Sequence, residues 1–181
     1  LRQNGGGSLE EAVNLTGLFI PRGPVVQSKD SRENIAFKAS RDAAPIYEGP
    51  MVVLTSRSSA SASEILAAAL QDYTRAIIVG EKSTFGKGTV QQLLPVATSQ
   101  FGLRLGGQDN RTGALKLTIQ KFYRIAGGST QLKGVVPDII LPSVTDAMDI
   151  GEGALDNPLL YDEIPSQNYK IVQNELPITP L

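Results

Sequence analysis

A serine at the start of a helix is the first residue whose type and surroundings could do chemistry. Ser61 lies in the run Ser59-Ala60-Ser61-Ala62-Ser63-Glu64-Ile65, immediately ahead of an apolar helical stripe. A hydroxyl in this position points outward, and the N–H of the next residue, Ala62, can stabilise an oxyanion with help from the helix dipole. The structural alternative is strong, because Ser61 and Glu64 have capping-box spacing and most such serines only cap a helix.

A lysine in a glycine-rich loop is the second such residue. Lys87 lies in the run Thr84-Phe85-Gly86-Lys87-Gly88, and the chain contains no histidine and no cysteine. A nucleophilic serine would therefore need another base, and a neutral lysine is the natural replacement. The ordinary lysine pKa of about 10.4 leaves the amine charged near pH 7, so Lys87 would have to be buried against apolar walls such as Phe85. Together with Ser61, this lysine predicts a Ser-Lys peptidase.

The same loop could instead bind phosphate, and the spacing tests that alternative. A nucleotide-binding P-loop has four residues between its first glycine and the Gly-Lys pair, followed by Ser or Thr. Here residues 81–85 separate Gly80 from Gly86, and Gly88 follows the lysine. The pattern fails at two points, which argues against nucleotide binding.

Three further residues could complete the site. Gln91 lies four residues after Lys87 and could accept a hydrogen bond from it, although a surface glutamine on a strand fits the spacing equally well. Gly6 and Gly7 could bring a backbone N–H to the same oxyanion, since glycine permits close backbone approach, or could form a plain tight turn.

Two acidic residues of the central helix are interpreted as structural. Glu64 has the spacing of a reciprocal cap, and Asp72 is expected to anchor a salt bridge or a loop. The absence of histidine and cysteine argues against a structural zinc site, and the predicted chemistry needs no cofactor.

The composition fits one globular domain with a substantial core. The 181 residues are 41% hydrophobic and 19% charged, and 17 basic against 18 acidic residues give a net charge of −1. This balance does not favour nucleic acid or a membrane surface as a partner. No apolar run approaches the ~20 residues that a transmembrane helix needs. The first residues, Leu1-Arg2-Gln3-Asn4, read as the end of a strand, so we expect a fragment of a longer protein.

The elements that must position Ser61 and Lys87 follow from periodicity and turn signals. Apolar spacing predicts a helix over 62–73, and the order strand, helix, strand over 50–79 predicts a parallel pair with a right-handed crossover. The apolar run at 50–55 is expected to be buried on both faces, and the alternating run at 115–123 to be half-exposed. The remaining expected elements are a capped helix opened by Ser8, a hairpin of 25–28 with 35–39, strands at 76–79 and 90–96, a loop over 98–113, and an edge segment at 135–140.

We expect residues 143–181 to form an irregular C-terminal extension beside a core of residues 1–142. This extension either packs as extended strapping or belongs to a region cut short.

Four stretches together resemble the carboxyl-terminal processing, or tail-specific, serine proteases, most of all their bacterial periplasmic branch. They are Leu1–Gly7, Ser59–Ile65 with Gln71-Asp72-Tyr73, Gly80–Gln92, and Ile119–Arg124 with Gly128–Gln131, Lys133–Val135 and Pro137–Ile139. The resemblance implies Ser61 as nucleophile, Lys87 as general base and Gln91 as the residue that positions the lysine. It also implies the N–H groups of Gly7 and Ala62 as the oxyanion hole. The loop at 81–84 is one residue longer than the usual form, which could shift Lys87 unless a bulge absorbs it.

The resemblance also implies a fold and partners. The fold is α/β, a crotonase- or ClpP-like spiral of strand-strand-helix units with a mixed, largely parallel sheet. The substrates are proteins with apolar, unstructured C-terminal tails in the periplasm or cell envelope of a bacterium. A PDZ domain and an upstream part of the core are expected elsewhere in the full-length chain, so this fragment is expected to lack the substrate clamp, which leaves its own activity open. The resemblance leaves room for an adaptor protein and leaves the oligomeric state open.

Two other classes remain as alternatives. A non-catalytic binding or scaffold relative would keep the fold, although the intact Ser61, Lys87 and Gln91 argue against it. An acyl-CoA enzyme of the crotonase type would need a nucleotide-binding groove and carboxylates at its reaction centre, and neither is evident in the sequence.

Overall fold

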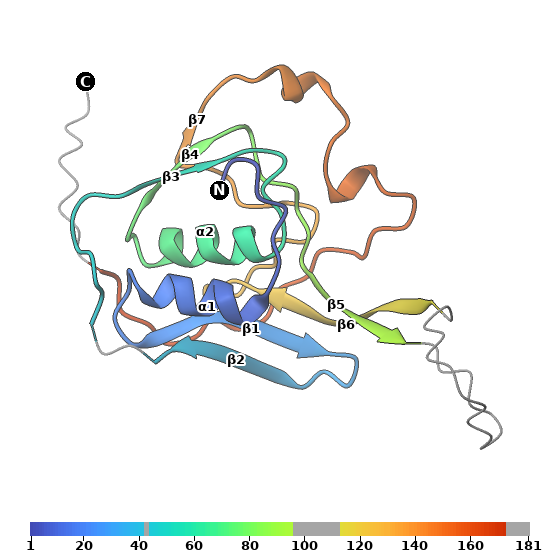
Figure 1. Cartoon of the computed structure of the whole chain (residues 1–181), viewed down its shortest axis with the longest axis horizontal. Coiled ribbons are helices and arrows are strands. Elements are labelled where there is room, and N and C mark those ends of the chain that lie inside the picture. The colour runs from blue at the N-terminus through green and yellow to red at the C-terminus, as the bar shows by residue number, and fades with distance from the viewer. Residues whose placement is uncertain (42–43, 96–112, 173–181) are drawn as a thin grey trace, which may run out of the picture.

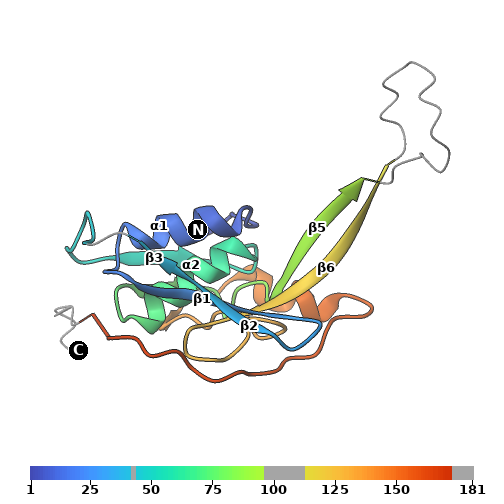
Figure 2. The same cartoon turned by 90° about the horizontal axis from the view of Figure 1, so that it is seen from below.

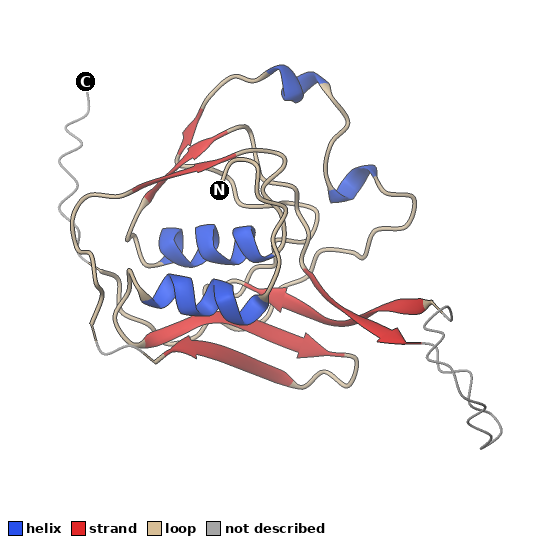
Figure 3. Ribbon diagram, in the orientation of Figure 1, coloured by secondary structure: helices blue, strands red, loops and turns tan. Residues whose placement is uncertain are grey.

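Two helices lie between two sheets in the computed structural model, which describes residues 1–41, 44–95 and 113–172. Helices α1 (Leu9–Gly17) and α2 (Ala62–Asp72) run side by side in the middle layer (Figures 1 and 3). A three-stranded sheet covers one side of the pair and a four-stranded sheet covers the other. The buried core joins the inward faces of these layers. Its largest fully buried apolar and aromatic side chains are Ile20, Val25, Leu70, Tyr73, Ile78, Phe122, Tyr123 and Ile125.

The four-stranded sheet is antiparallel and has the order β2-β1-β6-β5. The expected hairpin is confirmed as β1 (Gly23–Asp30) and β2 (Ile35–Ser40). Its other two strands, β5 (Thr89–Pro95) and β6 (Ala114–Tyr123), pair with a register shift between Val90 and Gln91.

The three-stranded sheet is parallel and has the order β3-β4-β7. Strands β3 (Val52–Thr55) and β4 (Ile77–Gly80) flank α2 in sequence, so the predicted parallel pair is confirmed, and β7 (Ile139–Ile140) is the expected edge segment. The prediction that the 50–55 strand is buried on both faces is wrong. Val52 and Leu54 are 57% and 51% exposed, because α2 covers only the opposite face of this sheet.

Both helices begin as their sequences predict. Ser8 caps α1 by accepting the Glu11 N–H at 3.3 Å. Every residue of α2 from Ser63 to Leu70 is buried. The alanine-rich sequence of this segment lets the helix pack between the two sheets. The glycine-rich loop before α1 and the turn before α2 meet at the same end of the helix pair, where the Ala60 N–H donates to the Asn4 carbonyl oxygen at 3.2 Å.

The outer part of β5 and β6 forms an arm that projects away from the body (Figure 2). The half-exposed, alternating pattern predicted for 115–123 is wrong for this reason. Exposure in β6 changes along the strand, from exposed at residues 114–119 to buried at Phe122 and Tyr123. The loop predicted over 98–113 lies, except for Gly113, outside the described residues.

The C-terminal segment 142–172 crosses the outside of the core as an irregular strap (Figures 1 and 2). It contains two short 3-10 helices, η1 (Val144–Ala147) and η2 (Glu152–Ala154). Its far end is tied to the core by the Gln167 N–H to Ile125 carbonyl bond at 2.8 Å and the Val172 N–H to Tyr73 carbonyl bond at 2.9 Å. Within residues 1–41, 44–95 and 113–172, no helix has the length and apolar character to span a membrane.

Candidate active site

Ser61 adopts a backbone conformation that L-residues rarely take. Its φ of 57° and ψ of −116° place it in the turn between β3 and α2. Such a conformation costs on the order of 1–3 kcal/mol and persists only where the surroundings fix it. Here the Ser61 N–H donates to Glu64 Oε2 at 2.7 Å, and the Glu64 N–H donates back to the Ser61 carbonyl at 2.8 Å. The sharp turn leaves the Ser61 side chain at the wall of a cavity.

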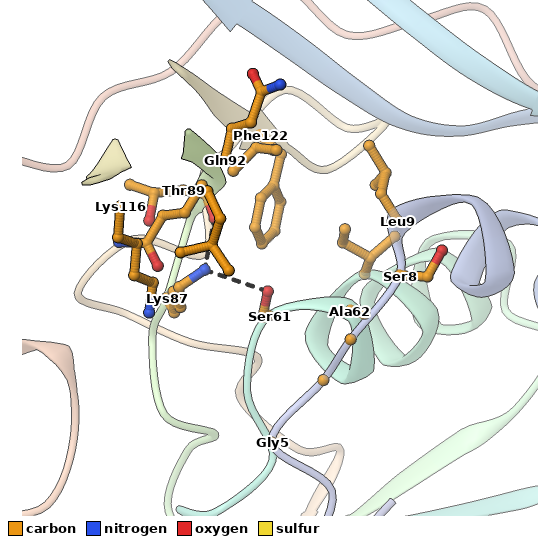
Figure 4. A pocket seen from close by; sticks show the side chains of 16 residues that line it. Gly5, Ser8, Leu9, Ser61, Ala62, Lys87, Thr89, Gln92, Lys116 and Phe122 are labelled. Carbon is orange, nitrogen blue, oxygen red and sulfur yellow. Dashed lines mark hydrogen bonds between the residues drawn. The ribbon is translucent and has the colours of Figure 1, made fainter. Parts of the chain in front are cut away.

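That cavity has a volume of about 680 Å³ and lies between the start of α2, the glycine-rich loop before α1 and the β5–β6 pair (Figure 4). Ser61, Lys87 and Gly7 line it together. Its apolar lining includes Leu9, Ile65, Val90 and Phe122.

The structure brings Lys87 to Ser61. Lys87 Nζ lies 3.4 Å from Ser61 Oγ and donates a 2.7 Å hydrogen bond to the Thr89 carbonyl oxygen. Figure 4 shows the lysine amine between these two acceptors. The longer 81–84 loop therefore does not carry the amine away from the serine.

The environment of Lys87 shifts its protonation equilibrium toward the neutral form. Burial lowers the pKa of Lys87, and the nearby cation of Lys116 lowers it further, while the carboxylates of Glu152 and Glu64 act in the opposite direction. A base must be uncharged to accept a proton, so a lowered pKa increases the fraction of Lys87 that can do so near neutral pH.

Glu64 holds both parts of this pair from inside the protein. Its side chain is fully buried, and its two oxygens accept the Thr84 hydroxyl at 2.6 Å, the Gly86 N–H at 2.7 Å and the Lys87 N–H at 3.0 Å, besides the Ser61 N–H. Burial raises the pKa of Glu64 to about 7, while these four donors favour its charged form. The predicted reciprocal cap is confirmed, but the same carboxylate also fixes the loop that carries the lysine.

Two residues beside Ser61 line the cavity with backbone N–H groups that could serve an oxyanion. Gly7 and Ala62 both line it, and among the described residues neither N–H has a hydrogen-bond partner. Gly6 stands against the Ser61 turn with φ of 95°, where an added Cβ would lie 2.5 Å from the Ala60 carbonyl oxygen and 2.8 Å from the Ala62 nitrogen. The glycine-rich loop is therefore packed directly on the residues that would surround an oxyanion.

Gln91 lines the same cavity, but its side chain is exposed. In the described part of the chain, the groups that accept from Lys87 Nζ are Ser61 and Thr89. Asp72 lies away from the cavity and forms an ion pair with Arg124, so its interpretation as a salt-bridge anchor is confirmed.

The Thr89 carbonyl, Lys116 and Glu152 were not expected as neighbours of Lys87. A backbone acceptor carries no side-chain signal, and the two charged residues lie 29 and 65 positions further along the chain than Lys87. The described residues contain no cluster of three or more His, Cys, Asp or Glu placed to hold a metal ion.

The model of peptidase family S41 matches residues 1–141 of the chain. A tail-specific protease from Haemophilus influenzae is 51% identical over 174 residues, which are 96% of this chain and 24% of that protein. A carboxy-terminal-processing protease from Bartonella bacilliformis is 37% identical over 142 residues, 78% of this chain and 30% of that one. The photosystem II D1 C-terminal processing protease has a TM-score of 0.63 and 33% identity over 77% of this chain and 33% of its own. The chain thus spans about a quarter to a third of the length of these relatives.

Proposed function

Because the chain belongs to peptidase family S41, we propose that it is the catalytic part of a serine endopeptidase with a Ser-Lys dyad. Ser61 is the nucleophile and Lys87 is the general base. The observation that carries this proposal is the 3.4 Å separation of Lys87 Nζ and Ser61 Oγ, in surroundings that lower the lysine pKa.

The proposed reaction proceeds in two halves. Ser61 Oγ attacks the scissile carbonyl carbon while its proton passes to neutral Lys87. The resulting oxyanion accepts hydrogen bonds from the N–H groups of Gly7 and Ala62. The tetrahedral intermediate collapses to an ester on Ser61, and Lys87 gives its proton to the departing amine. Water then attacks the ester, again losing a proton to Lys87, and the acid product leaves as Ser61 recovers its hydrogen.

Gln91 is proposed as the residue that orients Lys87. Its place in the cavity wall, two residues after the Thr89 carbonyl that already accepts from the lysine, supports this role. We infer that its amide oxygen reaches the amine during the reaction, when Lys87 carries a proton and needs a further acceptor.

The proposed substrates of the full-length protein are proteins with apolar, unstructured C-terminal tails in the bacterial periplasm or envelope. The names of the tail-specific and carboxy-terminal-processing relatives support substrates that are recognised or cleaved at their C-terminal tails. A PDZ domain elsewhere in the full-length protein would capture the tail by strand addition, and an adaptor protein could deliver substrates to it. The division into a core of residues 1–142 and an extension from 143 remains a prediction.

The test compares the full-length protein with three variants on a folded substrate that carries an apolar tail. Ser61→Ala and Lys87→Ala should lower kcat by at least about 10³-fold without changing substrate affinity, and Gln91→Ala should have a smaller effect. Lys82→Ala is the matched control, because Lys82 is an exposed lysine in the same loop. Equal cleavage by the wild type, Ser61→Ala and Lys87→Ala would exclude the proposal, and tail binding without cleavage by the wild type would indicate a binding relative.

A further inference from the structure

The strap touches the loop that carries Lys87. The Glu152 N–H of η2 donates to the Phe85 carbonyl oxygen at 2.9 Å, two residues before the lysine. Glu152 itself is buried, with 8% of its surface exposed. This contact comes from residues beyond the 1–141 range that matches the S41 family model.

Gln131 links the strap to the loop through its side chain. It is fully buried, and its Oε1 accepts the Gly88 N–H at 2.8 Å. Its Nε2 donates to Glu152 Oε1 at 3.1 Å and to the Leu159 carbonyl oxygen at 3.0 Å. Because both Nε2 hydrogens are used on the strap, the amide is oriented with its oxygen toward Gly88.

The two residues that flank Gln131 hold the same loop at Gly86 and Lys87. The Thr130 hydroxyl donates to the Lys87 carbonyl at 3.2 Å, and the Leu132 N–H donates to the Gly86 carbonyl at 2.8 Å. Gly88 is packed so closely that an added Cβ would lie 2.7 Å from the Gln131 nitrogen. The loop is thus fixed by Glu64 from within the core and by Gln131 from the side of the strap.

We propose that Gln131 and Glu152 are positioning residues, through which the C-terminal strap holds the 86–88 loop and sets the direction from which Lys87 approaches Ser61. The part of this inference that has Lys87 acting on Ser61 as a base rests on the proposed function. The hydrogen bonds between the strap and the loop do not depend on whether the protein cleaves. It assigns a role in the site to the strap, which the sequence indicated only as packing.

Removing the charge of Glu152 can distinguish a positioning role of this residue from an electrostatic effect on Lys87. Among the described residues, the charged groups that act on Lys87 are Glu152, Lys116 and Glu64. The carboxylate of Glu152 favours the protonated lysine, which is the wrong state for a base. An amide at position 152 keeps an acceptor for Gln131 and removes the charge. If Glu152 acts by holding Gln131, the amide should serve as well as the acid.

The experiment compares Glu152→Ala and Glu152→Gln in the full-length protein. Glu152→Ala should lower kcat about three- to tenfold with KM unchanged and speed amide hydrogen exchange of the 85–89 loop, because Gln131 loses one of its two acceptors. Glu152→Gln should restore kcat and exchange to near wild-type values and move the acidic limb of the pH–rate profile to lower pH. Glu163→Ala is the control, since Glu163 is an exposed acid on the same strap.

Three results would overturn the inference. They are wild-type kcat and exchange in Glu152→Ala, equal impairment of the two Glu152 variants, and a Glu163→Ala variant as impaired as Glu152→Ala. Failure of the proposed function would give a different result, because Ser61→Ala and Lys87→Ala would then cleave like the wild type. The hydrogen-exchange measurement would still show whether the strap holds the loop.

Discussion

The carboxylate of Glu64 accepts the backbone N–H of Lys87 at 3.0 Å, from a helix residue 23 positions earlier in the chain. The accepting atom, Oε2, also takes the Ser61 N–H at 2.7 Å. One oxygen atom therefore ties the backbones of the proposed nucleophile and the proposed base to a common point inside the protein.

Replacing Glu64 by glutamine should lower both the stability of the protein and its peptidase activity. Glu64→Gln turns one acceptor oxygen into an NH₂ group that faces backbone donors, so at least one buried N–H loses its partner at a cost of about 1–3 kcal/mol. We expect a lower free energy of unfolding by that amount and a kcat reduced by about 10- to 100-fold. Urea unfolding and peptidase assays measure the two effects. Glu11→Gln, in the exposed first turn of α1, should change neither, and a wild-type kcat in Glu64→Gln would contradict the prediction.

Lys116 should set part of the pH dependence. Because the base must be neutral, kcat/KM should rise with pH through the Lys87 pKa, which lies below its usual value. Lys116→Gln removes a cation that disfavours the protonated lysine, so the Lys87 pKa should rise and the acidic limb of the profile should move to higher pH.

The control for this shift is Lys133→Gln, since Lys133 lies over the Tyr161 ring and not in the cavity. High salt should reduce the difference between wild type and Lys116→Gln by screening the charge. Superimposable pH profiles at low salt would show that Lys116 has no such role.

Gly6 should tolerate no side chain. In Gly6→Ala the new Cβ would meet the Ala60 carbonyl at 2.5 Å, at a backbone φ of 95° that alanine rarely adopts. The loop must then move away from the Ser61 turn and carry the Gly7 N–H with it, so we expect kcat to fall by about 10²-fold or more, the scale of a lost oxyanion donor. Gly5→Ala, where no atom lies within 4 Å of the new Cβ, should keep near wild-type activity. Similar activities in the two variants would argue against an oxyanion role for this loop.

The strained backbone of Ser61 should be visible as a difference in the free energy of unfolding between two Ser61 variants. Ser61→Ala keeps the cost of φ 57°, whereas Ser61→Gly removes it and adds only the smaller entropic cost of glycine in the unfolded chain. We expect Ser61→Gly to be the more stable of the two by about 1 kcal/mol in urea unfolding. A less stable Ser61→Gly would show that the turn is not strained.

Local patterns in the sequence were enough for the elements that carry the site. The Ser8 cap, the strand-helix-strand order around α2 and the reciprocal cap by Glu64 all depend on residues close in sequence, and the structure has each of them. The Ser61–Lys87 pair followed from residue types and a family resemblance, since no periodicity measures a distance across 26 positions.

What the sequence missed depends on the assembled layers. Val52 and Leu54 are predicted to be core residues because their side chains are apolar. Their exposure depends on whether a second layer covers that face of the sheet, which the sequence does not show. Likewise, β6 has the alternation of a half-covered strand, but its outer half belongs to an arm with little packed against it. The hydrogen bonds from Lys87 to Glu64 and from Gln131 to Glu152 are also tertiary contacts, and no local sequence pattern indicates either of them.

The shared oxygen of Glu64 has a consequence for biosynthesis. A partly folded chain in which α2 has formed but the 84–88 loop has not docked would present a serine with no base beside it. The proposed Ser61–Lys87 pair would therefore be assembled only when that loop docks on the Glu64 carboxylate.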